Sequence, residues 1–332
     1  MSRLLRVELD RFASRALIRA GVVAVLVICC FAVVSAWNSA SPPSQAEQDQ
    51  ARVYYEQALT DWEQNGEQYV ADCRAQEEAD KETADDPALV DYGCDGMTAP
   101  RLEDWIAGAP SFARDTAALL TSLSLLLVLA PVLLAGSFVS AEFSTGSIAN
   151  WLTFAPRRVR VYLSKVLAAG LAIIPVALVA AAIVLGGSWA AYRYFDTINA
   201  GVSTDLGSPM AVALRLVALT PVVAVLGAAL GFLVRHTAAV LGVVLGWVVL
   251  VEGILVNWVQ TLRPWTLTLN ISAWVSGSAP YWTQECTTTE SGRSCRSVEH
   301  VLSQTQGAVY LLVVTAVVAG VALLVFRRRD VG

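Results

Sequence analysis

The residues that most often carry acid–base or nucleotide chemistry are scarce in this sequence. Its 332 residues include two histidines, His236 and His300, and two lysines, Lys81 and Lys165. The zinc-protease motif H-E-x-x-H is absent, and neither lysine follows a glycine as it would in the phosphate-binding motif G-x-x-x-x-G-K-[ST]. We therefore expect no catalytic centre, no metal site and no cofactor held by this chain, which should not hydrolyse ATP by itself.

The composition is that of a membrane protein. Hydrophobic residues make up 55% of the chain and charged residues 15%, whereas about 25% of an ordinary soluble domain is charged. A helix needs about 20 apolar residues to cross a bilayer, because its backbone polar groups must be satisfied within the segment. Six runs meet this requirement: 16–36, 117–140, 163–190, 211–234, 238–257 and 307–326. The sequence therefore predicts an all-α polytopic membrane protein with six transmembrane helices.

Basic residues gather in three segments, which sets the expected orientation. They lie at the N-terminus, after the second run and at the C-terminus, and comprise Arg3, Arg6, Arg11, Arg15, Arg19, Arg157, Arg158, Arg160, Lys165, Arg327, Arg328 and Arg329. Since lysine and arginine near span ends are retained in the cytoplasm, both termini are predicted to be cytoplasmic. Residues 1–15 have apolar side chains on one helical face and are expected to form an interfacial amphipathic helix. Residues 141–162 and 327–332 are assigned to the cytoplasm for the same reason.

The segments 37–116, 191–210 and 258–306 are then predicted to lie on the extracytoplasmic side of the membrane. Residues 37–116 hold 18 of the 28 acidic residues, and we expect a small, mainly helical domain there, followed by turns. Residues 258–306 contain an aromatic stretch broken by prolines and a glycine, which predicts an interfacial or partly re-entrant segment. It is too interrupted to cross the membrane.

The cysteines agree with this orientation, because disulfides persist in oxidising compartments. Four cysteines fall in the predicted outside segments, and none falls in a predicted cytoplasmic segment. Three pairings of the four are possible, and proximity favours Cys73 with Cys94 and Cys286 with Cys295. Free thiols are the alternative.

Glu252 is the acidic residue placed well inside a predicted span. A carboxylate at such a depth is by default a functional hypothesis. Pairing with Arg215, near the outer end of the preceding span, is an equally good structural account. Both interpretations stay open at the level of sequence.

Four glycines in the fourth and fifth runs have a spacing that favours close helix packing. Gly227 and Gly231 are four residues apart in the fourth run, as are Gly242 and Gly246 in the fifth. Small residues at this spacing let two helices approach each other closely. We therefore expect the two runs to form a tight antiparallel hairpin.

Residues 142–165, EFSTGSIANWLTFAPRRVRVYLSK, form a short polar segment between two apolar runs. Gly146 and Ser147 break the helical periodicity, IANWLTF can form a short amphipathic helix at the membrane surface, and Pro156 ends it. A basic loop that obeys the positive-inside rule would explain the arginines. It would not explain the spacing of the glutamate, the Gly-Ser pair and the proline.

The pattern E-x-x-x-G-S-I-x-x-x-L-x-x-x-P-R-R-x-R-V-x-x-x-K resembles the signature of membrane subunits of ABC transporters of the type 2 permease class, especially an actinobacterial branch. In that family this segment is a coupling helix that docks on a separate subunit, which binds ATP and Mg²⁺. The resemblance implies coupling positions at Glu142, Gly146, Ser147, Pro156, Arg158 and Lys165. It covers about 24 residues in motif and most of the chain in topology.

The resemblance also implies a function and a location. The chain would be the permease subunit of an exporter in a bacterial plasma membrane, paired with a second permease copy or a paralogue and with two ATP-binding subunits. No nucleic-acid partner is expected. The large acidic segment 37–116 departs from many members of the family and leaves the substrate open. A membrane sensor or assembly scaffold that presents this acidic domain is the competing hypothesis.

Overall fold

The computed structural model describes residues 2–41, 43–83, 90–105, 110–154, 157–195, 206–289 and 292–329. Side chains are described for all of these except residues 2, 3, 83, 103, 149, 152, 154, 285–289 and 292–296. Pro156 and the side chains of Cys286 and Cys295 therefore lie outside the described part of the chain, and the roles inferred for them from the sequence stay predictions.

The chain forms two compact units. The first, here the bundle unit, comprises Met1–Ala40, Ser111–Tyr281 and Glu299–Gly332. The second, here the insert unit, comprises Ser41–Pro110 and Trp282–Val298. Each is described by itself below.

Among its described residues, the bundle unit contains six helices that are long and apolar enough to cross a membrane, so the predicted number of spans is confirmed. They are α2 (Ala16–Ala40), α5 (Phe112–Ser144), α7 (Arg158–Tyr194), α8 (Gly207–Val234), the stretch Thr237–Trp258 and α12 (Gln304–Arg328). Each predicted apolar run lies within one of them. The fifth span is composite: α9 (Thr237–Gly246), a π-helix η3 (Trp247–Leu255) and α10 (Val256–Trp258) follow one another.

Helices α5 and α8 approach each other closely at two glycines. A Cβ atom on Gly227 would lie 2.1 Å from the Val132 carbonyl oxygen, and one on Gly231 would lie 2.7 Å from the Gly136 carbonyl oxygen. By contrast, a Cβ atom on Gly242 or Gly246 would meet no described atom within 4 Å. The predicted glycine contact between the fourth and fifth spans is therefore wrong. The spacing of Gly227 and Gly231 does serve close packing, but the partner is α5.

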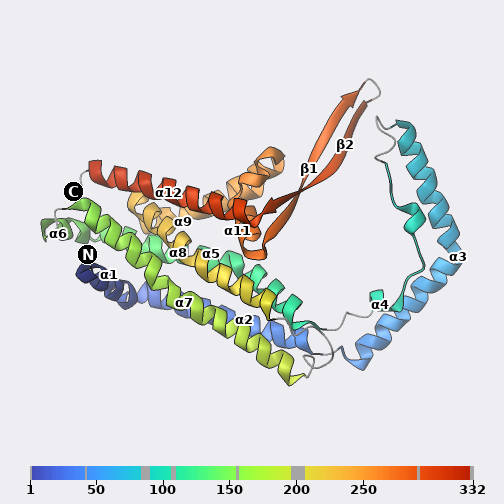
Figure 1. The fold of residues 1–332 in the computed structure, drawn as a ribbon, viewed down its shortest axis with the longest axis horizontal. Helices are drawn as coiled ribbons and strands as arrows, with labels where there is room; N and C mark the ends of the chain where they lie inside the picture. The colour runs from blue at the N-terminus through green and yellow to red at the C-terminus, as the bar shows by residue number, and fades with distance from the viewer. Residues whose placement is uncertain are drawn as a thin grey trace. The chain divides into compact units, whose positions relative to one another are not determined.

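Both chain termini lie at one end of the bundle unit, together with α6 (Ser147–Phe154) (Figure 1). We call this the terminal end. The N-terminal helix α1 (Ser2–Ser14) packs there against α7, and the ring of Phe12 contacts that of Phe138 on α5 at 5.1 Å between centroids. The amphipathic N-terminal helix is thus present, and its apolar face is buried by protein at Phe12, which is 3% exposed.

At the other end of the bundle unit, the segment predicted to be interfacial or re-entrant folds as a helical turn, η4 (Gln260–Trp265), and a short helix, α11 (Leu267–Ser276). Helix α11 packs on α12, α5 and α8. Trp274 Nε1 donates to the Arg215 carbonyl at 2.8 Å, and Arg215 Nη1 donates to the Val275 carbonyl at 3.1 Å. These contacts hold α11 in the bundle.

Two strands that the sequence analysis did not predict follow α11. Strands β1 (Ser278–Thr289) and β2 (Gly292–Ser303) pair as a two-stranded sheet (Figure 1). The all-α class still describes the chain, because all six candidate spans are helices.

The insert unit begins with one long helix, α3 (Gln45–Thr83), followed by a turn η2 (Cys94–Gly96) and the short helix α4 (Leu102–Trp105). Cys73 and Cys94 form the predicted disulfide. Arg74 pairs with Asp95 at 2.6 Å beside it. The disulfide therefore fixes the turn against the C-terminal half of α3.

Candidate functional site

The short helix α6 is joined to α5 by a glycine turn. Gly146 has φ +68°, a left-handed conformation that glycine adopts without steric cost, and its amide donates to the Phe143 carbonyl at 3.1 Å. Ser147 Oγ donates to the Glu142 carbonyl at 3.3 Å. The predicted break at Gly146 and Ser147 thus turns the chain from α5 into α6, where Ile148 is fully buried and Asn150 and Thr153 are exposed.

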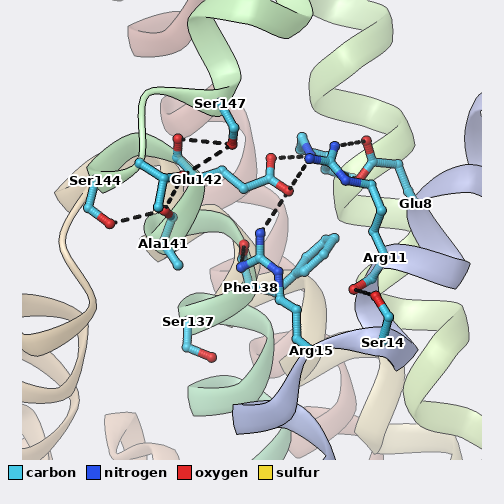
Figure 2. A network of polar contacts seen from close by, with 12 residues as sticks. Glu8, Arg11, Ser14, Arg15, Ser137, Phe138, Ala141, Glu142, Ser144 and Ser147 are labelled. Atoms are coloured by element: carbon cyan, nitrogen blue, oxygen red, sulfur yellow. Dashed lines mark hydrogen bonds and ion pairs between the residues drawn. The ribbon is translucent and has the colours of Figure 1, made fainter.

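The carboxylate of Glu142, near the C-terminal end of α5, is completely buried among cations (Figure 2). Arg15 Nη2 donates to Glu142 Oε1 at 2.9 Å, and Arg11 Nη2 lies 3.6 Å from the same oxygen. Lys165 Nζ on α7 lies 2.5 Å from Glu142 Oε2. Three cations from three parts of the chain therefore surround one carboxylate.

Lys165 is also fully buried and joins a second carboxylate to this group. Its Nζ donates to Glu8 Oε2 at 2.8 Å, and Arg11 Nη1 lies 3.6 Å from Glu8 Oε1. We call Glu8, Arg11, Arg15, Glu142 and Lys165 the ionic cluster. Its three cations and two carboxylates give it a net charge of +1. Since buried charges are tolerated when paired, the cluster connects α1, α5 and α7 only while it is complete.

Arg15 lies over the Phe138 ring, 4.9 Å from its centroid, and its Nη1 donates to the Phe138 carbonyl at 2.8 Å. Burial lowers the pKa of the Arg15 guanidinium from its ordinary value, and the Glu142 carboxylate opposes that shift. Arginine remains protonated in proteins even so. Arg15 is thus a permanent positive charge at the junction of α1 and α2.

The ionic cluster reaches α6 through Arg11. The Arg11 guanidinium lies over the Trp151 ring at 5.4 Å from its centroid, within the range of cation–π attraction. Arg11 therefore contacts Glu8, Glu142 and α6 at once. A movement of α6 would have to disturb this contact.

Arg158, in the first turn of α7, has a different partner. Its Nη1 donates to the carbonyls of Phe326, Arg327 and Arg329, the last at 2.7 Å. A cation at these carbonyls satisfies groups that a helix end leaves unpaired. Arg158 therefore caps the C-terminal end of α12.

The family model described as ABC-2 family transporter protein matches residues 9–331. The chain belongs to this family. No curated protein and no solved structure matched it. The protein is therefore an ABC-2 permease, a membrane component without an ATPase motif of its own, and its family implies an ATP-binding partner.

Of the permease's six coupling positions inferred from sequence, Glu142 and Lys165 meet in the ionic cluster, and Gly146 and Ser147 form the adjoining turn. Arg158 lies at the end of α12 instead. Glu142 and Lys165 are buried, so neither offers a surface to another protein in this fold.

Glu252 does not pair with Arg215 in the permease, so that structural account is wrong. Its carboxylate accepts from Trp247 Nε1 at 3.0 Å and from the amides of Leu267 and Thr268 at 2.8 and 3.1 Å. Those two amides open α11, where a helix attracts negative charge. Arg215 instead donates to the Val275 carbonyl.

Sequence reasoning missed Glu8 and Trp151 and read Arg11 and Arg15 only as markers of orientation. The sequence did contain a signal: positions 8, 11 and 15, in α1 and directly after it, are spaced three and four residues apart. Phe12 lies four residues after Glu8. This spacing places charged side chains on the same helical face as a large apolar one. A charged stripe beside Phe12 indicates a partner in the protein more than a lipid headgroup.

Proposed function

We propose that this permease is the membrane subunit of an ATP-driven exporter and that α6 is the element on which the ATP-binding subunit docks. The proposal rests on the difference between the two sides of α6. Its buried side rests on the ionic cluster through Trp151, and its other side exposes Asn150 and Thr153. A push on the exposed side is transmitted to α1, α5 and α7 together.

In this proposal the terminal end of the bundle faces the cytoplasm. The basic residues of both termini and of the segment after α5 support that orientation. The acidic insert unit then lies outside the bacterial plasma membrane, and its Cys73–Cys94 disulfide fits an oxidising compartment. The ATP-binding subunit, which holds ATP and Mg²⁺, meets α6 from the cytoplasm.

The inferred coupling positions take separate roles. Glu142 and Lys165 act as positioning residues that hold together the ionic cluster on which α6 packs, while Gly146 and Ser147 set the angle between α6 and α5. Arg158 ties α12 to the start of α7, so α12 follows the same movement. Pro156 stays a predicted end of the docking segment.

The assembly we propose has two permease subunits, identical or paralogous, and two ATP-binding subunits. A substrate path between two permease halves is what the resemblance to type 2 permeases implies. Export is favoured because that family is dominated by exporters.

The test is a bulky substitution on the exposed side of α6. In Thr153→Trp we expect association with the ATP-binding subunit, measured by pull-down from detergent, to fall about tenfold or more. ATP turnover that remains should no longer respond to substrate. Thr153 is suitable because its hydroxyl donates only to the Asn150 carbonyl of its own helix.

Thr60→Trp is the matched control. Thr60 is also an exposed helical threonine, and its hydroxyl donates to the Glu56 carbonyl of α3 in the insert unit. It should bind the ATP-binding subunit as the wild type does. If Thr153→Trp associates and couples as well as Thr60→Trp, α6 is not the docking element.

A further inference from the structure

A cavity of about 330 Å³ lies within the bundle unit, between α5, α8, α9, the π-helix η3, α11 and α12. Its walls are almost entirely aliphatic, with one representative each from α5, α8, α9, α11 and α12: Val132, Leu226, Val244, Ile271 and Leu311. Small-molecule sites in proteins occupy about 300–1,000 Å³ and are mostly apolar with a few polar groups. The cavity has the size and lining of such a site.

The polar groups of this cavity are concentrated near η3 and the start of α11. Glu252, Thr268, Trp247 and Tyr310 all line it. The carboxylate of Glu252 is fixed there by three donors, Trp247 Nε1 and the amides of Leu267 and Thr268. A charged group therefore has a defined position at the edge of an apolar space.

These donors are all electrically neutral. Among the described residues no cationic side chain lies within ion-pair distance of Glu252, and Arg215 on the neighbouring helix α8 is committed to the Val275 carbonyl. The full negative charge of the carboxylate thus remains beside the cavity. Such charges in membrane segments usually have a partner or a function.

We propose that this cavity binds a lipophilic cation, a molecule with an apolar body and one positively charged nitrogen. The aliphatic walls fit the body, because apolar side chains offer it close van der Waals contacts. Glu252 attracts the nitrogen, and the rings of Trp247 and Tyr310 supply electron-rich faces suited to a quaternary ammonium. An anionic amphiphile of the same length is disfavoured by the same carboxylate.

This assignment names a substrate class and to that extent rests on the proposed export function. The binding step itself needs only the permease. It can therefore be measured on the purified full chain in lipid nanodiscs without the ATP-binding subunit.

The experiment compares three probes with the same ten-carbon tail: decyltrimethylammonium, decanol and decyl sulfate. We expect decyltrimethylammonium to bind at least about tenfold more tightly than either other probe. Equal binding of decanol would identify a simple hydrocarbon cavity, and equal or tighter binding of decyl sulfate would contradict the role of Glu252. Either result overturns the proposal.

Two variants locate the site. Val244→Trp fills the cavity from a position that is 8% exposed and should abolish binding of decyltrimethylammonium, while Val249→Trp, on the same span but 55% exposed and away from the cavity, should bind normally. Glu252→Gln should weaken decyltrimethylammonium about tenfold and leave decanol unchanged. Val244 packs in the same buried core as Ile271 of α11, so the unfolding midpoint of Val244→Trp is compared with that of Val249→Trp to show that loss of binding is not unfolding.

The outcomes separate this proposal from the export proposal. Binding that survives Val244→Trp places the probe elsewhere and overturns the cavity assignment even if ATP turnover is coupled. The three variants can also bind decyltrimethylammonium as expected in a permease whose α6 does not dock an ATP-binding subunit. That result supports the binding site and contradicts the export function.

Discussion

Glu142 and Glu252 are both carboxylates of the bundle unit, yet their surroundings are opposite. Glu142 is completely buried and lies within 3.6 Å of three cations, Arg11, Arg15 and Lys165. Glu252 is half-buried, accepts three hydrogen bonds from neutral donors and borders an apolar cavity. The first carboxylate completes a cluster that holds three helices. The second has no cationic partner among the described residues.

The partners of an intramembrane carboxylate indicate whether it is structural. A carboxylate surrounded by permanent cations has little left to offer a ligand, and removing it leaves those cations buried without compensation. A carboxylate held by amide and indole groups is positioned but not neutralised. The number of cations around the carboxylate, and not its depth, separates the two cases.

The largest effect is expected for Glu142→Gln. It changes the net charge of the ionic cluster from +1 to +2, and breaking a buried pair by removing one partner costs about 3–5 kcal/mol. The midpoint of thermal unfolding in nanodiscs should fall sharply, and the yield of folded protein with it. Glu63→Gln on the exposed face of α3 should leave the midpoint unchanged.

The charge count adds a sharper form of this prediction. Lys165→Gln takes the cluster to zero, so it should cost less than Glu142→Gln, and the double variant returns the charge to +1 and should recover part of the loss. If the double variant is less stable than Glu142→Gln alone, charge balance is not what holds the cluster together.

A smaller effect on stability is expected for Glu252→Gln. Glu252 contributes a charge at the N-terminus of α11, and such an interaction is worth about 0.3–1 kcal/mol, or about 2 kcal/mol in partly buried geometry. The unfolding midpoint should fall less than in Glu142→Gln. A fall in the unfolding midpoint as large as that of Glu142→Gln would show that both carboxylates are structural.

The spans and the role of Glu142 differ in how far they could be predicted from the sequence. The six spans were predictable because apolar length is a local property, readable in windows of about 20 residues. The role of Glu142 was not, because its partners Arg15 and Lys165 lie in distant parts of the chain and the Arg15 pair is separated by 127 positions. Gly227 and Gly231 show an intermediate case: their spacing indicated close packing, but only the fold identifies α5 as the neighbour.

Strands β1 and β2 were missed for a different reason. Tyr281 and Trp282 of β1 were read as part of an aromatic interfacial segment, and two strands with a polar turn give a weak signal beside six apolar helices. Glu252 was singled out correctly as unusual, but its two interpretations could not be separated. Choosing between a functional carboxylate and a pair with Arg215 required the positions of Arg215 and of the α11 amides. Those positions depend on the fold of η4 and α11 in the bundle.

The smallest effect, and the one most specific to coupling, is expected for Arg11→Lys. Lysine keeps the charge of the ionic cluster but replaces a planar guanidinium by a compact ammonium, which is a poorer partner for the face of Trp151. A cation–π contact of this kind is worth about 0.5–1 kcal/mol. Thermal stability should therefore change little, while association of the ATP-binding subunit with α6 weakens about two- to fivefold.

A double-mutant cycle isolates that contact. Arg11→Lys and Trp151→Leu should each weaken association, and together they should weaken it by less than the sum of the two, since both remove the same interaction. Arg6→Lys, at an exposed position of α1, should have no effect. Additive losses would show that Arg11 and Trp151 act separately. The ionic cluster would then support the three helices without guiding α6, and its difference from the Glu252 site would concern stability alone.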